Sequence, residues 1–351
     1  MSETIEIGVA RRNDASSDIP EVDYAAIKTK TSRFTNSKKQ KFNILDIDAR
    51  NGEPGPTILT STAFNYRFQP LYIAVMTTLA VQSGARVVSS EIPGITIDLD
   101  DPLHTTGDFQ TPAQTMLALS GDYDPLGTEQ IKAMYEVGEL SEDDEYHFVG
   151  VSFGACAVVA MARALSKRKL FAKKFNVTEM DLIDPVNAFG NHTIVRQAQL
   201  LYNLATTEDQ RRQLYLAENE AGGYGDGGKE FTKISPDASK HDKHVKLRQI
   251  VATYATGIGL RKGLHTTLAD ALRDAPELRN MHVTLSRAND SSVCRDSDLQ
   301  SAAETIRQSG GRADVQTLVG KQGEKIPIGH HVLDSISRYG SFAKARCERL
   351  S

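Results

Sequence analysis

The strongest chemical signal in the sequence lies at residues 150–154, which read Gly-Val-Ser-Phe-Gly and match the pattern G-x-S-x-G. A pattern with three fixed positions recurs by chance, so its surroundings decide its weight. Here it separates a strand-length apolar run, Tyr146–Val149, from a helix-length segment, Ala155–Lys167. A serine on a tight turn between a strand and a helix is typical of a catalytic nucleophile.

Each position of this turn has a physical reason. A nucleophile at Ser152 takes strained backbone angles that project its Oγ above the sheet edge, and the two glycines leave room where strand and helix nearly touch. The helix N-terminus places positive partial charge where an oxyanion develops. The competing interpretation is a glycine-flanked helix start in which Ser152 is only a cap.

With this turn and its context, the sequence resembles the α/β-hydrolase family over roughly residues 42–339. The family's chain order is nucleophile, acid, histidine. The resemblance assigns these roles to Ser152, Asp290 and His330. It also covers the segment 91–94, Glu-Ile-Pro-Gly, which is similar to the family's D-x-P-G.

Local sequence supports the two assignments that follow the serine. Asp290 comes after the predicted strand Met281–Ser286 and three positions before a hydrophobic residue, as in the family's acid loop. His330 directly follows a glycine and precedes the last predicted helix, as in the family's histidine loop. In these roles His330 would accept the serine proton and Asp290 would hold the imidazole in the required tautomer.

The oxyanion hole implied by the resemblance uses two backbone N–H groups. One belongs to Phe153, the residue after the nucleophile. The other comes from the loop after the predicted strand Thr57–Thr60, where the family often has His-Gly and this chain reads Thr-Ser-Thr-Ala-Phe from residue 60. Thr62 is the expected second donor, with Ala63 as the alternative.

Two further alternatives stay open within the site. His331 is adjacent to His330, and only the family's habit of placing the catalytic histidine after glycine separates the two. Asp184 competes with Asp290, because some family members carry the acid after the sixth strand. The plainer interpretation of Asp184 is that it ends the strand Met180–Ile183 together with Pro185.

The elements that must position these residues follow from hydrophobic patterning. Apolar runs of strand length alternate with helix-length segments, which predicts an α/β fold with a mostly parallel sheet flanked by helices. Besides the segments already named, the sequence predicts an N-terminal strand near Thr4–Val9, a strand at Arg86–Ser89, another at Val315–Val319, and helices at Leu71–Ser83, Thr128–Val137 and Val332–Tyr339.

Changes in composition and hydrophobic pattern along the chain predict four parts. Residues 1–41 form an N-terminal strand and polar loop, 42–185 the first part of the α/β core, 186–275 an inserted helical lid, and 276–351 the second part of the core. The insertion is polar and contains a glycine-rich tract at 222–228, which predicts a mobile loop.

The composition argues against several classes of function. The formal net charge is −4 with no basic stripe, which argues against a nucleic-acid partner. The sequence has no secretory signal or membrane-spanning run, and its three cysteines form no metal or disulfide pattern, so we expect a cytoplasmic protein without cofactor or metal. His241 and His244 lie three apart but lack a third ligand, and Cys156 is expected to be a small core residue.

The sequence therefore predicts a serine hydrolase that cleaves an ester or related acyl bond of a small molecule, with carboxylic esters as the broadest class. The resemblance implies the Ser-His-Asp triad and an acyl-enzyme. An acyltransferase on the same fold is the main alternative, because it would differ only in its acceptor. A hydrolase-fold binding protein without turnover is the third hypothesis.

Overall fold

The computed structural model describes most of the chain in segments. These are residues 3–7, 27–62, 68, 70–93, 112–119, 121–138, 140–141, 144–167, 175–186, 188, 199, 202–221, 263–321 and 326–350. The glycine tract at 222–228, His241, His244 and Ala63 lie outside the described residues, so the expectations attached to them stay predictions.

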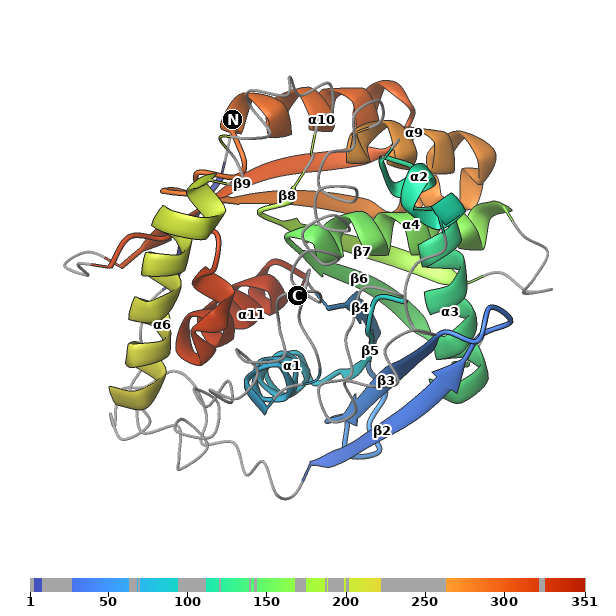
Figure 1. The fold of residues 1–351 in the computed structure, drawn as a ribbon, viewed down its shortest axis with the longest axis horizontal. Helices are drawn as coiled ribbons and strands as arrows, with labels where there is room; N and C mark the ends of the chain where they lie inside the picture. The colour runs from blue at the N-terminus through green and yellow to red at the C-terminus, as the bar shows by residue number, and fades with distance from the viewer. Residues whose placement is uncertain are drawn as a thin grey trace.

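A twisted, mostly parallel sheet forms the centre of the molecule (Figure 1). The described residues contribute nine strands in the order β1-β9-β8-β7-β6-β4-β5-β3-β2, and β3 runs antiparallel to both of its neighbours. The strands are β1 (Glu3–Ile7), β2 (Lys28–Thr35), β3 (Lys41–Asp48), β4 (Thr57–Ser61), β5 (Arg86–Ser90), β6 (Glu145–Val151), β7 (Asn176–Ile183), β8 (His282–Ala288) and β9 (Arg312–Gly320). The carboxyl ends of the parallel strands meet at one edge, where the loops after them converge.

Helices cover both faces of the sheet. The described helices are α1 (Pro70–Ser83), α2 (Pro112–Leu119), α3 (Asp124–Gly138), α4 (Phe153–Lys167), α6 (Asp209–Ala221), α9 (Leu264–Asp274), α10 (Asp296–Gln308) and α11 (Ile336–Leu350). Helices α1 and α11 pack together on one face, and α3, α4, α9 and α10 pack on the other (Figure 1).

Neighbouring strand residues divide between two hydrophobic cores. On β4, Ile58 belongs to the core under α1 and α11, whereas Leu59 belongs to the core under α3 and α4. On β7, Ile183 and Leu182 divide in the same way. Both faces of these central parallel strands are largely buried, so their sequences show no clean alternation of apolar and polar residues, and buried polar residues such as Thr60 and Asp181 interrupt the apolar ones.

The structure confirms the predicted α/β architecture and adds elements that the sequence analysis lacked. Strands β2 and β3 form an antiparallel pair at one edge, and α2 lies within a stretch that reads as loop. Most side chains of β2 are exposed, so the strand carries little hydrophobic signal. The final helix, α11, begins at Ile336 after a 3-10 turn and runs to Leu350, well beyond the predicted end at Tyr339.

Two residues near the ends of the predicted insertion, Ala188 and His265, lie next to each other in the fold. The backbone N–H and Nδ1 of His265 both lie within hydrogen-bonding distance of the carbonyl oxygen of Ala188, at 3.3 and 3.1 Å. Helix α9, which starts at Leu264, packs against α4 and α10 and is part of the core layer. Helix α9 therefore packs with the core although it lies inside the predicted range 186–275, and the insertion itself stays a prediction. Among the described helices, none is long and apolar enough to cross a membrane.

Candidate active site

Ser152 occupies a one-residue turn between β6, which ends at Val151, and α4, which begins at Phe153. Its backbone φ is +55°, in the left-handed region that side chains other than glycine rarely adopt. The Ser152 N–H donates to the carbonyl oxygen of Ile183 at 2.9 Å, which ties the turn to the end of the neighbouring strand. Backbone strain of this kind persists where the surroundings enforce it, typically at functional sites.

The two glycines of the motif are required by close packing. A Cβ atom at Gly150 would lie 2.5 Å from the Cα of Ala155 and 2.6 Å from a methyl group of Val158. A Cβ atom at Gly154 would lie 2.8 Å from the carbonyl oxygen of Ser61. The close approach predicted from the sequence is therefore present between β6, α4 and the end of β4. A larger residue at either glycine would force backbone atoms to move.

His330 connects Ser152 to a buried carboxylate. Its Nε2 lies 2.8 Å from the Ser152 Oγ, and its Nδ1 lies 2.5 Å from Asp184 Oδ2. Because the carboxylate can only accept, Nδ1 carries the proton and Nε2 is left to accept from the serine hydroxyl. The structure therefore brings the predicted Ser152 and His330 together in the arrangement that general-base activation of a serine requires.

Asp184, rather than Asp290, supplies the carboxylate next to His330. Asp184 follows β7 with a positive φ of +44° and is 1% exposed. Its Oδ1 accepts from the Ala288 N–H at 3.1 Å, and its Oδ2 accepts from the Ser291 hydroxyl at 2.6 Å as well as from His330. These contacts hold the carboxylate in one orientation.

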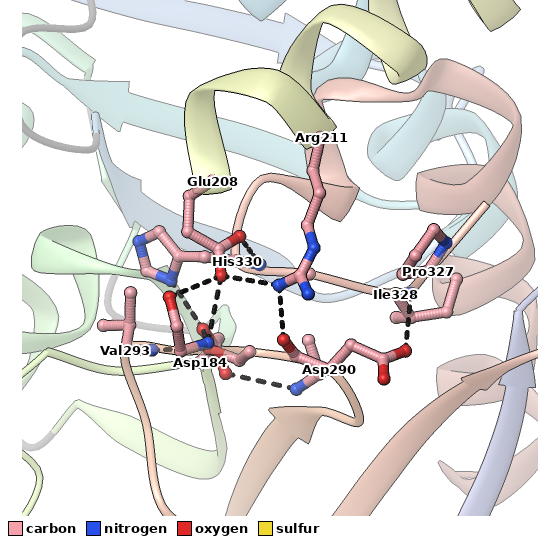
Figure 2. Close-up of polar contacts among 12 residues, drawn as sticks. Asp184, Glu208, Arg211, Asp290, Val293, Pro327, Ile328 and His330 are labelled. Atoms are coloured by element: carbon pink, nitrogen blue, oxygen red, sulfur yellow. Dashed lines mark hydrogen bonds and ion pairs between the residues drawn. The ribbon is translucent and has the colours of Figure 1, made fainter. Parts of the chain in front are cut away.

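Asp290 has a different place in the structure, which corrects its assignment as the acid. Its carboxylate Oδ2 accepts from the Ile328 N–H at 3.1 Å, and its own N–H donates to the Ile328 carbonyl at 2.8 Å (Figure 2). Asp290 thus forms hydrogen bonds with the backbone just before His330 and not with the His330 imidazole. The sequence could not separate the two aspartates because β7 and β8 are neighbouring parallel strands, so an aspartate after either strand lies at the same edge of the sheet.

The alternative histidine, His331, points elsewhere. Its Nδ1 lies 3.6 Å from Asp334 Oδ2, and its ring makes an edge-on contact with the His330 ring. Burial lowers the pKa of the His331 imidazole to about 4, and the nearby Asp334 opposes that shift only in part. His331 is therefore a neutral packing partner of His330 at neutral pH.

The backbone N–H groups of the two expected oxyanion donors, Phe153 and Thr62, have different surroundings. Phe153 is the first residue of α4, so its N–H lies at the helix N-terminus beside Ser152. The Thr62 N–H donates to the carbonyl oxygen of Ser90 at 3.0 Å, which extends the hydrogen bonding between β4 and β5. The Thr62 N–H thus already has an acceptor, which argues against Thr62 as the second donor. The alternative, Ala63, lies outside the described residues.

Two further residues contact Asp184 or His330, and no motif in the sequence predicts them. Ser291 donates to Asp184, and its position directly after Asp290 could have drawn attention to it. Glu208, at the end of a π-helical turn (Leu204–Glu208) that leads into α6, accepts from the His330 N–H at 2.8 Å. No motif surrounds Glu208 in the sequence, and only the packing of α6 reveals its contact with His330 (Figure 2).

Cys156 and possible metal ligands are the remaining candidates within the described part of the chain. The Cys156 thiol is buried and donates to the Val186 carbonyl, and burial raises its pKa to about 12, so it is not a second nucleophile. Within the described residues, no group of three or more histidine, cysteine, aspartate or glutamate side chains has the arrangement of a metal site.

The strand order, with a serine turn after β6, an aspartate after β7 and a histidine after β9, defines the α/β-hydrolase fold. Comparison with solved structures agrees: a serine hydrolase from the polyaromatic-hydrocarbon-degrading bacterium Cycloclasticus zankles has a TM-score of 0.50 at 13% identity, over 92% of this chain and 98% of its own. The resemblance inferred from the sequence is thus confirmed for the fold.

Two further structures are similar at lower TM-scores. An esterase from Exiguobacterium antarcticum has a TM-score of 0.48 at 14% identity, over 90% of this chain and 99% of its own. A thioesterase domain from the curacin biosynthetic pathway has a TM-score of 0.47 at 16% identity, over 91% and 99%. No protein-family profile matches the sequence, and neither does any curated protein.

Proposed function

We propose that the protein is a serine hydrolase that cleaves a carboxylic ester or a related acyl bond of a small molecule. The proposed triad consists of Ser152 as nucleophile, His330 as general base and acid, and Asp184 as the residue that orients the histidine. The observation that carries the proposal is the continuous chain from Ser152 Oγ through His330 to Asp184 Oδ2, with contacts of 2.8 and 2.5 Å.

Acylation begins with proton transfer along this chain. His330 Nε2 accepts the Ser152 proton as Oγ attacks the acyl carbon, and the imidazolium that forms faces the Asp184 carboxylate. Asp184 is held by Ala288 and Ser291 before the reaction starts, so little reorganisation is required when the charge appears. The Phe153 N–H and the positive end of α4 would stabilise the developing oxyanion.

The second half of the reaction reuses the same groups. The His330 imidazolium returns its proton to the leaving group, which departs and leaves an acyl ester on Ser152. Water then takes the place of the leaving group, gives a proton to Nε2 and attacks the acyl carbon. Collapse of this second tetrahedral intermediate releases the carboxylic acid and restores the Ser152 hydroxyl.

Fluorophosphonate labelling, combined with a panel of p-nitrophenyl esters of increasing acyl length, tests the proposal. We expect the wild-type protein to be labelled at Ser152 and to hydrolyse at least one ester, and Ser152→Ala to lose both properties while keeping its far-UV circular dichroism spectrum. Product analysis with added alcohol separates hydrolysis from acyl transfer. A wild-type protein that is neither labelled nor active, or a Ser152→Ala variant that keeps its activity, would contradict the assignment.

A further inference from the structure

Helix α6 lies along the segment that carries His330, which we call the histidine loop (residues 326–335). Contacts recur along one face of the helix at the spacing of helical turns. Tyr215 accepts from the Gly329 N–H at 2.8 Å and donates to the Pro327 carbonyl at 2.5 Å. Arg212 pairs with Asp334 at 2.7 Å. The helix belongs to the predicted lid insertion, yet it is bound to the catalytic side of the sheet.

Glu208 lies at the end of this face nearest to the triad. Its side chain is fully buried, and its Oε2 accepts from the His330 N–H at 2.8 Å. Its Oε1 accepts from the Ser292 N–H at 2.9 Å and from the Ser292 hydroxyl at 2.7 Å, and pairs with Arg211 at 2.9 Å (Figure 2). One carboxylate therefore joins the loop that carries His330 to the loop after β8.

The loop after β8 matters because it also holds the acid. Ser291, next to Ser292, donates to Asp184 Oδ2, the oxygen that contacts His330 Nδ1. Glu208 thus fixes the backbone on both sides of the Asp184–His330 contact. Burial alone would raise the pKa of the Glu208 carboxyl, but the hydrogen bonds from Ser292 and His330 outweigh burial and hold the pKa below its usual range. Glu208 is therefore a charged group at neutral pH.

We propose that Glu208 is a positioning residue of the active site, which holds His330 in register with Ser152 and Asp184 and adds a negative charge beside the imidazole. This inference rests on the proposed function. The charged groups around His330 are Asp184 at the end of β7, Glu208 just before α6 with its partner Arg211 on α6, and Asp334 in its own loop. The adjacent His331 is neutral. Loss of the Glu208 charge leaves the Arg211 cation less balanced, which disfavours the imidazolium.

The test compares Glu208→Gln and Glu208→Ala with two control variants. Asp209→Asn removes an exposed charge from the adjacent position, the first residue of α6. Glu218→Gln removes a carboxylate that pairs with the buried Arg338 at 2.7 Å, farther along α6, and so reports the effect of weaker helix docking alone. Kinetics on the best p-nitrophenyl ester are measured below the Tm of each variant, over a range of pH.

We expect both Glu208 variants to lower kcat by roughly 10- to 100-fold, since small displacements of catalytic groups have effects of that size, with KM within about 2-fold of wild type. In Glu208→Gln the acidic limb of the pH–kcat/KM profile should move to lower pH by about half a unit or more. The His330 amide should lose protection from hydrogen exchange. Both controls should keep the wild-type kcat and pH profile, with Glu218→Gln lowering only Tm.

The outcomes separate this inference from the proposed function. A wild-type protein without esterase activity or labelling contradicts the hydrolase proposal, while the hydrogen-exchange comparison still tests the positioning of His330. If the wild type is active and the Glu208 variants keep its kcat and pH profile, or lose no more activity than Glu218→Gln, the role of Glu208 is purely structural and the inference is overturned.

Discussion

Ser291 and His330 donate hydrogen bonds to the same oxygen atom, Oδ2 of Asp184, at 2.6 and 2.5 Å. The Ser291 hydroxyl oxygen in turn accepts from the Val293 N–H at 3.1 Å and from the Cys294 N–H at 3.4 Å. The loop after β8 is therefore folded around a hydroxyl group that also fixes the proposed catalytic acid. This relationship explains why the carboxylate can belong to β7 while the next loop still contributes to its orientation.

Replacement of Ser291 by alanine should lower kcat/KM by about 10-fold, because a hydrogen bond to a charged group contributes about 1.5–3 kcal/mol and part of that supports the transition state. The Val293 and Cys294 N–H groups also lose their shared acceptor, so Tm should fall. Steady-state kinetics and thermal unfolding measure the two effects. A variant with lower Tm but unchanged kcat/KM would show that the hydroxyl only shapes the loop.

Replacement of Asp184 by asparagine should lower kcat far more than the same replacement of Asp290. Asp184→Asn leaves His330 without its carboxylate and favours the wrong tautomer, so kcat should fall by about 10³- to 10⁴-fold. Asp290→Asn keeps an acceptor for the Ile328 N–H, so kcat should remain within about 10-fold and mainly Tm should respond. Ester hydrolysis by the two purified variants decides the matter. Equal losses, or a larger loss at Asp290, would return the acid role to Asp290.

Replacement of Gly150 by alanine should destabilise the fold by about 1–3 kcal/mol or more, the range for overpacked interiors. The added Cβ would meet backbone atoms of Ala155, which cannot rotate away as a flexible side chain can. Urea unfolding followed by circular dichroism measures the loss. Gly52→Ala is a useful contrast, since a Cβ there meets nothing within 4 Å and only its positive φ opposes the change. Equal losses at the two positions would mean that close packing at Gly150 is not the cause.

The stability of the folded protein should depend on pH through His331. Burial holds the pKa of its imidazole at about 4, whereas the unfolded chain titrates near the ordinary value of about 6.5. Between these values the unfolded state binds a proton that the folded state does not. The free energy of unfolding therefore rises with pH in this window and falls as the pH drops from about 6.5 toward 4.

His331→Asn should flatten this dependence, although His147 and His265, whose pKa values are also lowered by burial, act in the same direction and leave a remaining slope. Urea unfolding of wild type and variant at several pH values between 4.5 and 7.5 provides the comparison. Parallel slopes for the two proteins would show that His331 is accessible to protons in the folded state.

The proposed nucleophile could be predicted from adjacent residues, whereas the choice of the proposed acid depends on tertiary contacts. Ser152 lies between a strand and a helix that both carry strong apolar patterns, so its turn could be located from adjacent residues alone. Asp184 and Asp290 follow neighbouring strands of one sheet, and either could reach the histidine. The choice depends on the left-handed backbone at Asp184 and on the Ser291 hydroxyl, neither of which leaves a pattern in the sequence.

The same distinction applies to the fold. All five residues of the central strand β4 and the last four of β7 are buried, and the apolar pairs Ile58–Leu59 and Leu182–Ile183 mark these strands in the sequence, whereas the exposed edge strand β2 has no such pair. The insertion was predicted from its polar composition, but α9 within the predicted range belongs to the core because its amphipathic face packs on α4 and α10. The contact of Glu208 with His330 depends on how a polar helix docks, which composition does not reveal.

The contact between Ala188 and His265 has a consequence for how such a chain can diverge. The two residues are 77 positions apart in the sequence but in contact, so a change in chain length between them need not move the strands on either side. The stretch from Glu208 to Asn219 is the exception, because both residues form hydrogen bonds with the histidine loop. Swapping insertions between related proteins should therefore transplant substrate preference only when this stretch is kept with its own core.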